Sequence, residues 1–542
     1  MRTENGKRKT ENGKWETGSS PFSVLRSPLF IALALMAASL TLSPFVMGAS
    51  QFLLVAAWLF TGDPIKVKLQ RFFHNKIALL LVSLYLLHVI GLAWTSDFTY
   101  ALKDLRVKLP LLVLPLVLSS VKPLEKKLTD LLLLVYVLSV FVATCISYWI
   151  YLQHNYQDIR EISQYISHIR FCLNIVLVIG IIGYYLFTRK MPWWEKLLAV
   201  ALILWFVYQL YIFESISGYL AFIGLVVTSL LYLYFTKIKN KPMRIAGAVL
   251  VIALPLAIGI YLYRTVESML IVEPVNLEQL DKKTALGNDY WHDTVCFPVE
   301  NGQYVGLYFC RPEMRSAWNE RSLLDYDGTT GNGENLEATL ARYLTSKGLR
   351  KDAQGVASLD DRDIHNVEQG VANYVNQSHP GVYARLAETL FEYHQYRRNN
   401  NPNGGSLSQR IEYTRASLHL IRKHPVFGVG TGDLPDAYAQ AYNELNSPLK
   451  ERYRHRAHNQ YLSITVGFGL LGLALFLVVL FYPYLSSKKN RSYLYTIFLV
   501  ILLISMLPED TIESQAGVTW FALFNSLFIF AFRKEEDASE QR

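Results

Sequence analysis

Long apolar blocks separated by short polar connections dominate this chain. Nine blocks lie in its first half, and three more follow a long hydrophilic segment. They fall near 28–47, 50–61, 77–95, 109–121, 128–151, 170–187, 196–213, 216–235, 245–263, 460–484, 492–507 and 516–532. A helix needs about 20 apolar residues to cross a bilayer, so the second and fourth blocks are short for spans. The pattern predicts an all-α polytopic membrane protein with about twelve transmembrane helices.

The charges of the connections predict which side of the membrane each one faces. If the N-terminus is cytoplasmic, the connections that follow even-numbered blocks lie inside, and every one of them is basic. Their Lys and Arg residues fall within 66–76, 122–127, 189–196, 237–244, 488–491 and 533–534. The opposite connections include the acidic PEDTIES at 508–514. Because Lys and Arg are enriched on the cytoplasmic side, both termini are predicted inside and residues 264–457 outside.

This topology divides the chain into five parts. They are a disordered cytoplasmic leader (1–27), a first membrane part with helices 1–9 (28–263), an outer domain (264–457), a second membrane part with helices 10–12 (458–533) and a cytoplasmic tail (534–542). The outer domain is large enough to have its own core. Apolar periodicity predicts that it is mainly helical, with helices over 336–349, 361–375, 384–398, 407–425 and 436–446.

Composition supports a membrane protein. The 542 residues are 51% hydrophobic and only 18% charged, less charge than a soluble protein of this size has. The net charge of +9 lies in short clusters between apolar blocks, which is not the pattern of a nucleic-acid-binding surface. Cys145 and Cys172 fall in apolar blocks. Cys296 and Cys310 fall in the outer domain, where they could form a disulfide or remain two thiols.

His458 stands where the tenth apolar block meets water. Arg454, His455 and Arg456 precede it, and Asn459 opens a run of apolar residues with no charge before Lys488. A helix N-terminus has unsatisfied N–H groups that favour an anion, and histidine exchanges protons near neutral pH. His458 is therefore a candidate general base beside an anion site. The alternative is an interfacial histidine that only caps the helix.

Several arginines lie on the predicted outer side, against the usual distribution of basic residues. Arg106 precedes the fourth block, Arg170 opens the sixth, and Arg410 and Arg415 lie on the amphipathic stretch 407–425. Guanidinium groups pair with phosphate oxygens, so such a cluster would suit a pyrophosphate. The alternative for each is a solvated or headgroup-bound side chain, which we prefer for Arg415.

The glycine-rich segment FGVGTGD at 427–433 includes Gly428, Gly430 and Asp433. It lacks the Lys-Ser/Thr of a phosphate-binding P-loop and follows no strand, so a structural turn with Asp433 as an orienting group is favoured. No spacing of His, Cys, Asp or Glu resembles a metal site, and no nucleotide fingerprint is present. An enzyme here would need an activated donor already in the membrane, such as a polyprenyl-pyrophosphate sugar, and no cofactor.

These residues resemble those of the O-antigen ligases. His458-Asn459, nine further residues and Gly469-Leu470-Leu471-Gly472 are similar to the family motif H-[N/S/Q]-x9-G-x-x-G, and RKHPVFGVGTGD at 422–433 is similar to the turn that precedes it. The resemblance implies a glycosyltransferase of the GT-C type in the bacterial inner membrane. It would move a glycan from undecaprenyl pyrophosphate to a lipid A core or other glycan acceptor on the periplasmic face, without metal or nucleotide.

The resemblance also implies roles for single residues. His458 would be the base that activates the acceptor hydroxyl. Arg170 and Arg410 would bind the pyrophosphate, with Arg106, Asn459 and Asp433 as further substrate-binding candidates. Many family members have a Ser-Arg pair at the start of the eighth span, where this chain has Ile216. Either another basic residue supplies that charge, or this chain differs in donor or activity.

Four alternatives remain open. An O-antigen polymerase or a ligase that glycosylates protein would use the same lipid-linked donor with another acceptor. A transporter of lipid-linked sugars would need polar groups inside its spans, which here are almost free of charge. A sensor or scaffold with an external binding domain would transfer no glycan and would not depend on His458.

Overall fold

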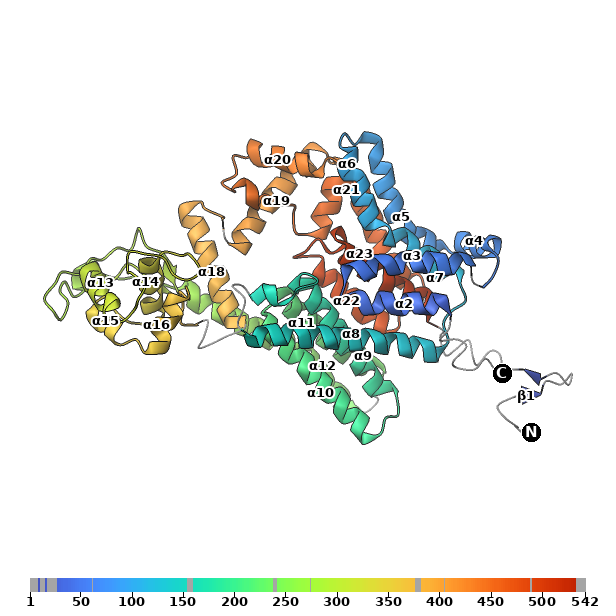
Figure 1. Cartoon of the computed structure of the whole chain (residues 1–542), viewed down its shortest axis with the longest axis horizontal. Coiled ribbons are helices and arrows are strands. Elements are labelled where there is room, and N and C mark those ends of the chain that lie inside the picture. The colour runs from blue at the N-terminus through green and yellow to red at the C-terminus, as the bar shows by residue number, and fades with distance from the viewer. Residues whose placement is uncertain are drawn as a thin grey trace.

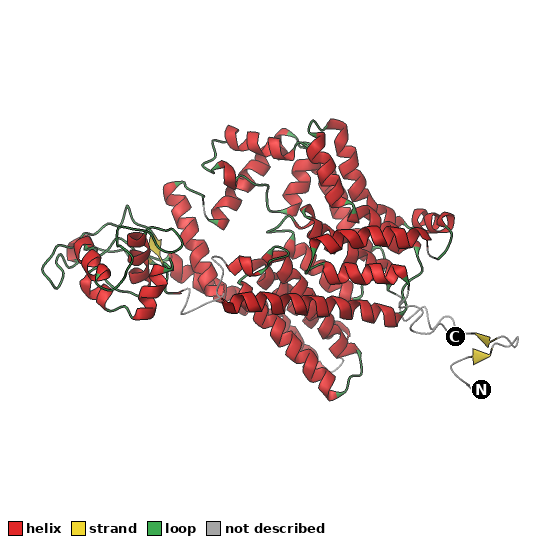
Figure 2. Ribbon diagram, viewed as in Figure 1, coloured by secondary structure: helices red, strands yellow, loops and turns green. Residues whose placement is uncertain are grey.

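The computed structural model describes residues 8–9, 15–16, 27–60, 62–153, 159–236, 241–272, 274–375, 382–403, 405–487 and 490–532, and their regular structure is almost all helical (Figures 1 and 2). The predicted tail 534–542 lies outside these residues. So does most of the leader 1–27, in which strands β1 (Arg8–Lys9) and β2 (Trp15–Glu16) pair antiparallel.

Each predicted apolar block forms a helix. In chain order these are α2 (Pro28–Ser39), α3 (Pro44–Phe60), α5 (Lys76–Ile90) with the 3-10 turn η1 (Gly91–Trp94), α7 (Pro110–Ser120), α8 (Lys126–Gln153), α9 (His168–Thr188), α10 (Trp193–Phe213), α11 (Ile216–Thr236), α12 (Lys241–Leu270), α21 (Gln460–Leu485), α22 (Tyr493–Ser505) and α23 (Gln515–Ser526) with the π-helix η7 (Leu527–Ala531). Two amphipathic helices, α4 (Ile65–His74) and α6 (Phe98–Lys108), lie between them.

The boundary between the first two blocks differs from the prediction. The first helix ends at Ser39 rather than near residue 47, and the next begins at Pro44 rather than near residue 50. Proline is favoured in the first turn of a helix, where its missing N–H is not needed, so Pro44 starts α3 inside what reads as one apolar run. The turn lets α2 and α3 pack against each other (Figure 1).

Among the described residues, six helices are long and apolar enough to cross a membrane: α5 with η1, α8, α9, α10, α11 and α21. The bent pair α3 and α4, with 111° between them, would make a seventh. Helices α2, α22 and α23 with η7 are apolar but shorter. The chain is therefore an all-α membrane protein. By length and composition the described residues give six or seven spans, and the number of twelve stays a prediction.

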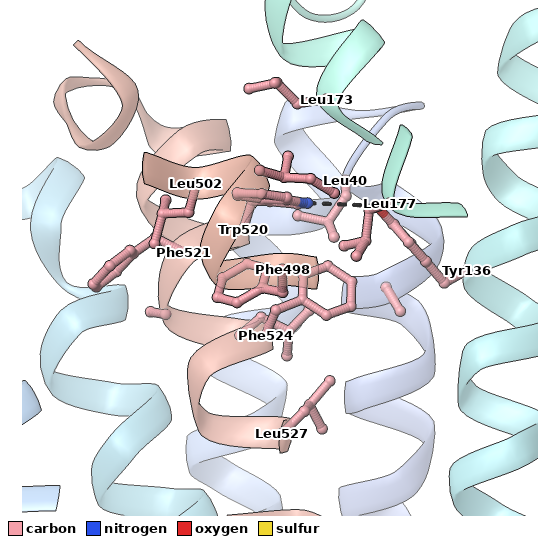
Figure 3. Packing of buried hydrophobic residues seen from close by; sticks show 14 of the residues in the cluster. Leu40, Tyr136, Leu173, Leu177, Phe498, Leu502, Trp520, Phe521, Phe524 and Leu527 are labelled. Carbon is pink, nitrogen blue, oxygen red and sulfur yellow. Dashed lines mark hydrogen bonds between the residues drawn. The ribbon is translucent and has the colours of Figure 1, made fainter. Parts of the chain in front are cut away.

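The membrane part packs around one large apolar core. In Figure 3, Phe498 of α22 and Trp520 and Phe524 of α23 lie near Tyr136 of α8 and Leu177 of α9, and Phe521 points to the other side, next to Leu502. Tyr136 of α8 gives this core a polar link, because its hydroxyl donates to Asn174 Oδ1 (2.7 Å) and accepts from Trp520 Nε1 (3.4 Å). Buried polar groups of this kind need partners, and here they tie three helices together.

The predicted outer domain packs around two separate cores. Residues 274–375, called the small domain below, contain the hairpin β3 (Val299–Glu300) and β4 (Gln303–Tyr304) and have their own apolar core. Their helices are α13 (Arg311–Asn319), α14 (Leu336–Ser346), α15 (Ala353–Ala357) and α16 (Asp361–Glu368). Cys296 is exposed, Cys310 is buried, and the two are not joined.

The rest of the outer segment belongs with the membrane part. It forms α18 (Val382–Asn399), α19 (Ser406–Lys423) and α20 (Leu434–Glu444). Tyr413 of α19 and Tyr438 of α20 share a buried cluster with Val466 of α21. Helix α18 stands between the small domain and the remaining helices (Figure 1). Amphipathic periodicity predicts these helices, but it does not predict which neighbouring element the apolar face of each helix packs against.

Candidate functional site

Helix α21 is broken close to its start, and the glycine turn fills the break. Gly469 has φ +66° and ψ −168°, which interrupts the helix. The backbone groups freed by the break are paired across the gap, because Val429 N donates to Val466 O (2.9 Å) and Gly430 N donates to Gly467 O (2.9 Å). Leu470 N donates to Pro425 O (2.8 Å). The glycine turn at 425–430 and the glycine-containing part of α21 are about 40 residues apart in sequence. Backbone hydrogen bonds therefore join them directly.

This close approach explains the glycines in both motifs. Gly428, Gly430 and Gly469 all have positive φ, which glycine adopts without strain. A Cβ on Gly428 would lie 2.4 Å from the backbone of Phe468, and one on Gly469 would lie 2.1 Å from Val426 O. At Gly472 a Cβ would meet the side chain of Phe468 at 2.3 Å. These residues have a structural function.

Asp433 fixes the same turn to the start of α6. Its carboxylate accepts hydrogen bonds from Ser96 N (2.8 Å) and Asp97 N (2.8 Å). Thr431 Oγ1 donates to His88 O (2.6 Å), which joins the turn to the end of α5 as well. The structure thus gives Asp433 an orienting position at a three-way junction, and Asp433 does not line the cavity that contains His458.

Asn459 caps α21 and joins it to the loop between α22 and α23. Its side-chain oxygen accepts from Leu462 N (3.0 Å), and its Nδ2 donates to Leu507 O (2.8 Å). The Asp510 carboxylate accepts from Asn459 N (3.0 Å) and from Ser463 Oγ (2.6 Å). The acidic loop 508–514 is therefore held against the first turn of α21. The loop between α22 and α23 is hydrogen-bonded there to the backbone and side chain of Asn459 and to the side chain of Ser463.

A buried charge network lies beneath this first turn. Lys108 Nζ contacts Asp104 (2.8 Å) and Glu513 (2.7 Å), and Arg456 contacts the same Glu513 carboxylate (2.7 Å). Gln460 Nε2 also donates to Glu513 (3.0 Å). Buried charges need such partners, and the network fixes the segment on both sides of His458.

His458 itself has an unusual backbone and a carboxylate neighbour. Its φ is +47°, which is uncommon outside glycine and typical of residues held in place by their surroundings. Its Nδ1 lies 3.9 Å from Glu509 Oε2, and its ring is 5.4 Å from that of Tyr413. About a third of the side chain (36%) is exposed, so the imidazole remains accessible to a substrate.

Glu509 brings His458 together with the two predicted arginines. Arg410 Nη2 lies 3.5 Å from Glu509 Oε1. Burial alone would raise the pKa of the Glu509 carboxyl, but its contact with His458 and the positive charges of Arg170 and Arg410 outweigh burial and hold that pKa below its usual range. Arg170 Nη2 also donates to Asp510 O (3.4 Å), and its buried Nε has no hydrogen-bond partner among the residues that the structure describes.

A cavity of about 520 Å³ opens beside these groups. Its lining comes from the connection before α9, the α10–α11 turn, α18, α19, His458 and Glu509. The charged or titratable side chains that line it are Arg160, His168, Glu214, Arg385, Glu388, Arg410, Tyr413, His458 and Glu509. Basic groups from four chain segments therefore surround one concave site, the arrangement expected for a polyanionic group.

The structure does not place Arg106 in this site. Arg106 is exposed on α6, and it is not part of the cavity lining. Ile216 does line the cavity, together with Arg160 and Arg385 from other elements. The cavity thus contains basic residues near the position where the family resemblance implies an arginine. Within the described residues, no group of three or more His, Cys, Asp or Glu could hold a metal ion.

Sequence reasoning missed Glu509, Tyr413, Arg160 and Arg385. In the sequence, the acidic segment 508–514 that contains Glu509 indicates only which side of the membrane this connection faces. Its position next to the tenth block is a contact between segments some 50 residues apart, and no local pattern reveals such a contact. Arg385 falls on a predicted helix, where one arginine among several gives no signal of its own.

Comparison with known proteins finds one family model, which covers part of this region. Residues 369–477 match a family model described as O-antigen ligase. The matched range includes α18, α19, the glycine turn, His458 and the broken part of α21. No curated protein matches the chain. The match supports a function of the O-antigen ligase or polymerase type, that of a glycosyltransferase-like membrane enzyme. Residues 369–477 are therefore similar to the O-antigen ligase domain, which confirms the resemblance to the O-antigen ligase family seen in the sequence.

Proposed function

We propose that this protein transfers a glycan from undecaprenyl pyrophosphate to a hydroxyl of a lipid A core acceptor. The observation that supports this most directly is the position of His458, Arg410 and Glu509 in the lining of one cavity of about 520 Å³. Arg170 is not part of that lining, but its charge acts on the Glu509 carboxylate. A base and two guanidinium groups in one site match what the reaction needs. The acceptor hydroxyl must lose a proton, and the departing pyrophosphate must be stabilised.

His458 would act as the general base. Since its Nδ1 is the ring nitrogen nearest to Glu509, we assign proton acceptance from the acceptor hydroxyl to Nε2. The acceptor oxygen then attacks the anomeric carbon, and the bond from that carbon to the pyrophosphate oxygen breaks. Glu509, kept charged by its lowered pKa, would orient the imidazole and stabilise the positive charge that develops on it.

Arg410 and Arg170 would bind the pyrophosphate. Arg410 is partly exposed (37% of its side chain) and lines the cavity, so it can reach a bound phosphate. Guanidinium groups match phosphate oxygens in pairs and keep their charge at every physiological pH. Arg160 and Arg385 line the same cavity and would supply the positive charge that Ile216 does not.

The site would face the periplasm. Every segment that lines the cavity, namely 159–169, 213–217, 385–413, 458 and 509, comes from a connection on the side that the charge distribution assigns to the outside, or from the end of a helix that meets it. We therefore place the protein in the bacterial inner membrane, with twelve apolar helices in the bilayer, both termini cytoplasmic and the small domain in the periplasm.

The test is glycan transfer by membranes that contain wild-type protein, His458→Ala or His365→Ala. His365 is an exposed histidine of the small domain and serves as the matched control. The substrates are undecaprenyl-pyrophosphate glycan and lipid A core. We expect His458→Ala to lose at least about a hundredfold in rate, and His365→Ala to keep the wild-type rate.

The product identifies the acceptor. Transfer to the core that depends on His458 supports the ligase. Elongation of the lipid-linked glycan would make the protein a polymerase, and glycan on protein would make it a protein ligase. If His458→Ala retained full transfer, the assignment of the base would be wrong.

A further inference from the structure

A second cavity lies where α18 meets the small domain. It has a volume of about 460 Å³, within the range of about 300–1,000 Å³ typical of small-molecule sites. Phe297, Phe391 and small apolar side chains form part of its lining. The remaining lining is polar and consists mainly of side-chain amides, namely Gln395, Asn399, Asn401 and Asn403. The cavity therefore combines apolar surface with groups that both donate and accept hydrogen bonds.

This cavity has fewer charged groups than the first one, whose lining has three arginines and three glutamates. Arg342 is its only ionisable lining residue. The guanidinium stacks 3.9 Å from the centre of the Phe391 ring and makes two hydrogen bonds of 2.9 Å to the buried carboxylate of Glu300. Because the charge of Arg342 is already paired, the cavity has no surplus charge to attract an anion. A neutral polar ligand suits it better.

The amides keep free hydrogen-bonding groups. Asn399 Nδ2 donates to Gln395 Oε1 (2.8 Å), and Asn403 Nδ2 donates to Asn401 Oδ1 (2.7 Å). In the part of the chain that the structure describes, this leaves Gln395 Nε2, Asn399 Oδ1 and Asn401 Nδ2 without a hydrogen bond. Two donors and one acceptor beside aromatic rings match a sugar. Its hydroxyls donate and accept, and its C–H face packs on the negative face of a ring.

One face of α18 connects the two cavities. Arg385 and Glu388 line the cavity at His458, and Phe391, Gln395 and Asn399 line the second one. These positions are spaced by three or four residues, so they lie along a single stripe of the helix. From Glu388 to Gln395 the helix rises about 10 Å, a distance that an oligosaccharide could cover.

We propose that the second cavity binds neutral sugar units of an oligosaccharide whose reacting end lies in the cavity at His458. This inference rests on the proposed function, because glycan transfer is what would place an oligosaccharide along α18. The sugar units could belong to the donor glycan or to the acceptor. The site would make the enzyme sensitive to glycan length, since a short glycan would not reach from one cavity to the other.

The first test measures binding without transfer. Detergent-solubilised full-length protein is applied to an array of neutral and anionic oligosaccharides as wild type, as the double variant Gln395→Ala/Asn399→Ala, as Phe391→Leu and as His458→Ala. Gln440→Ala, on an exposed amide of α20 outside both cavities, is the matched control. Size-exclusion chromatography checks that each variant is folded.

We expect wild type, His458→Ala and Gln440→Ala to bind neutral oligosaccharides. The double variant and Phe391→Leu should bind at least about tenfold more weakly, since each loses hydrogen bonds or ring contact. Because His458→Ala keeps binding, this result is separate from any failure of transfer. Failure of wild type to bind neutral glycans, or equal binding by the double variant, would overturn the inference.

The second test identifies the source of the sugar. Transfer is measured with donors of increasing glycan length and, separately, with acceptors of increasing length. A rise of about tenfold in KM of the double variant for long donors, with short donors unaffected, assigns the cavity to the donor. The same pattern with acceptor length assigns it to the acceptor. An unchanged KM in both series would contradict the proposal.

Discussion

At the residue scale, Glu509 explains why three basic groups can lie together. The charges of Arg170 and Arg410 would repel each other without an acidic group, and the Glu509 carboxylate, which also lies 3.9 Å from His458 Nδ1, offsets this repulsion. The carboxylate is largely buried (8% exposed), so its interactions with the three groups are weakly screened by solvent. Its removal should disturb the arrangement of the base and of the pyrophosphate-binding arginines together.

We predict that Glu509→Gln lowers transfer by about tenfold to a hundredfold, and by a similar factor at every pH from 5.5 to 8. The pKa of Glu509 is lowered in the folded protein, so its charge contributes stability above the unfolded value of about 4.3. That contribution is lost only as the pH falls below this value. Glu509 therefore stays ionised at pH 5.5, so lowering the pH to 5.5 does not remove the charge that Glu509→Gln removes.

The measurement is the pH profile of kcat/KM for wild type and Glu509→Gln. Glu320→Gln, on an exposed glutamate of the small domain, is the control and should follow the wild type. A Glu509→Gln enzyme that equals the wild type anywhere between pH 5.5 and 8 would show that the carboxylate has no part in the reaction.

At the element scale, the break in α21 accounts for the glycine motif. The helix stops and restarts at Gly469, and the turn 425–430 supplies the hydrogen-bond partners that the break leaves open. A helix with an interrupted backbone is stable only where neighbouring groups pair with it. The motif residues Gly469 and Gly472 thus hold the helix next to His458 in place, and the proposed chemistry would be that of the histidine.

We predict that Gly469→Ala destabilises the protein strongly, by about 3 kcal/mol. A Cβ at this position is disfavoured at φ +66° and would lie 2.1 Å from Val426 O. Gly467→Ala is the matched substitution in the same helix. Its Cβ would have only the side chain of Leu434 nearby, at 3.9 Å, so stability should change by less than about 1 kcal/mol.

Thermal unfolding of the two detergent-solubilised variants, followed by size-exclusion chromatography, measures the difference. If Gly469→Ala unfolds at the same temperature as Gly467→Ala, the break in α21 is not required for stability.

At the scale of the whole molecule, the arrangement predicts which cysteines can be reached from outside. Cys296 is exposed in the small domain, whereas Cys172 and Cys310 are buried. We predict that a membrane-impermeant maleimide labels Cys296 in intact spheroplasts and that Cys296→Ser abolishes this labelling. A cysteine placed at the exposed Lys190, in the predicted cytoplasmic connection before α10, should react only after lysis. If the cysteine at position 190 reacted in intact spheroplasts and Cys296 reacted only after lysis, the predicted membrane topology would be reversed.

The sequence by itself determined the all-α membrane character and the positions of most helices, and it singled out His458 as a candidate base. It could do so because apolar runs, basic connections and the His-Asn motif are local features, readable within one segment. Most helix limits agree with the apolar blocks to within a few residues. The exception at Pro44 arose because α2 and α3 form a single apolar run, in which only the proline marks the turn.

Only the tertiary structure decided which polar residues meet. Arg410 and Glu509 lie about 100 residues apart in sequence and line the same cavity, whereas Arg106, with the same residue type and predicted side as Arg410, lies outside it. Their association depends on how helices rotate and pack, since a helix places a side chain on a given face but does not select the neighbour that covers it. The division of residues 264–457 between two cores has the same cause, because amphipathic helices can cover either a core of their own or an adjoining transmembrane helix.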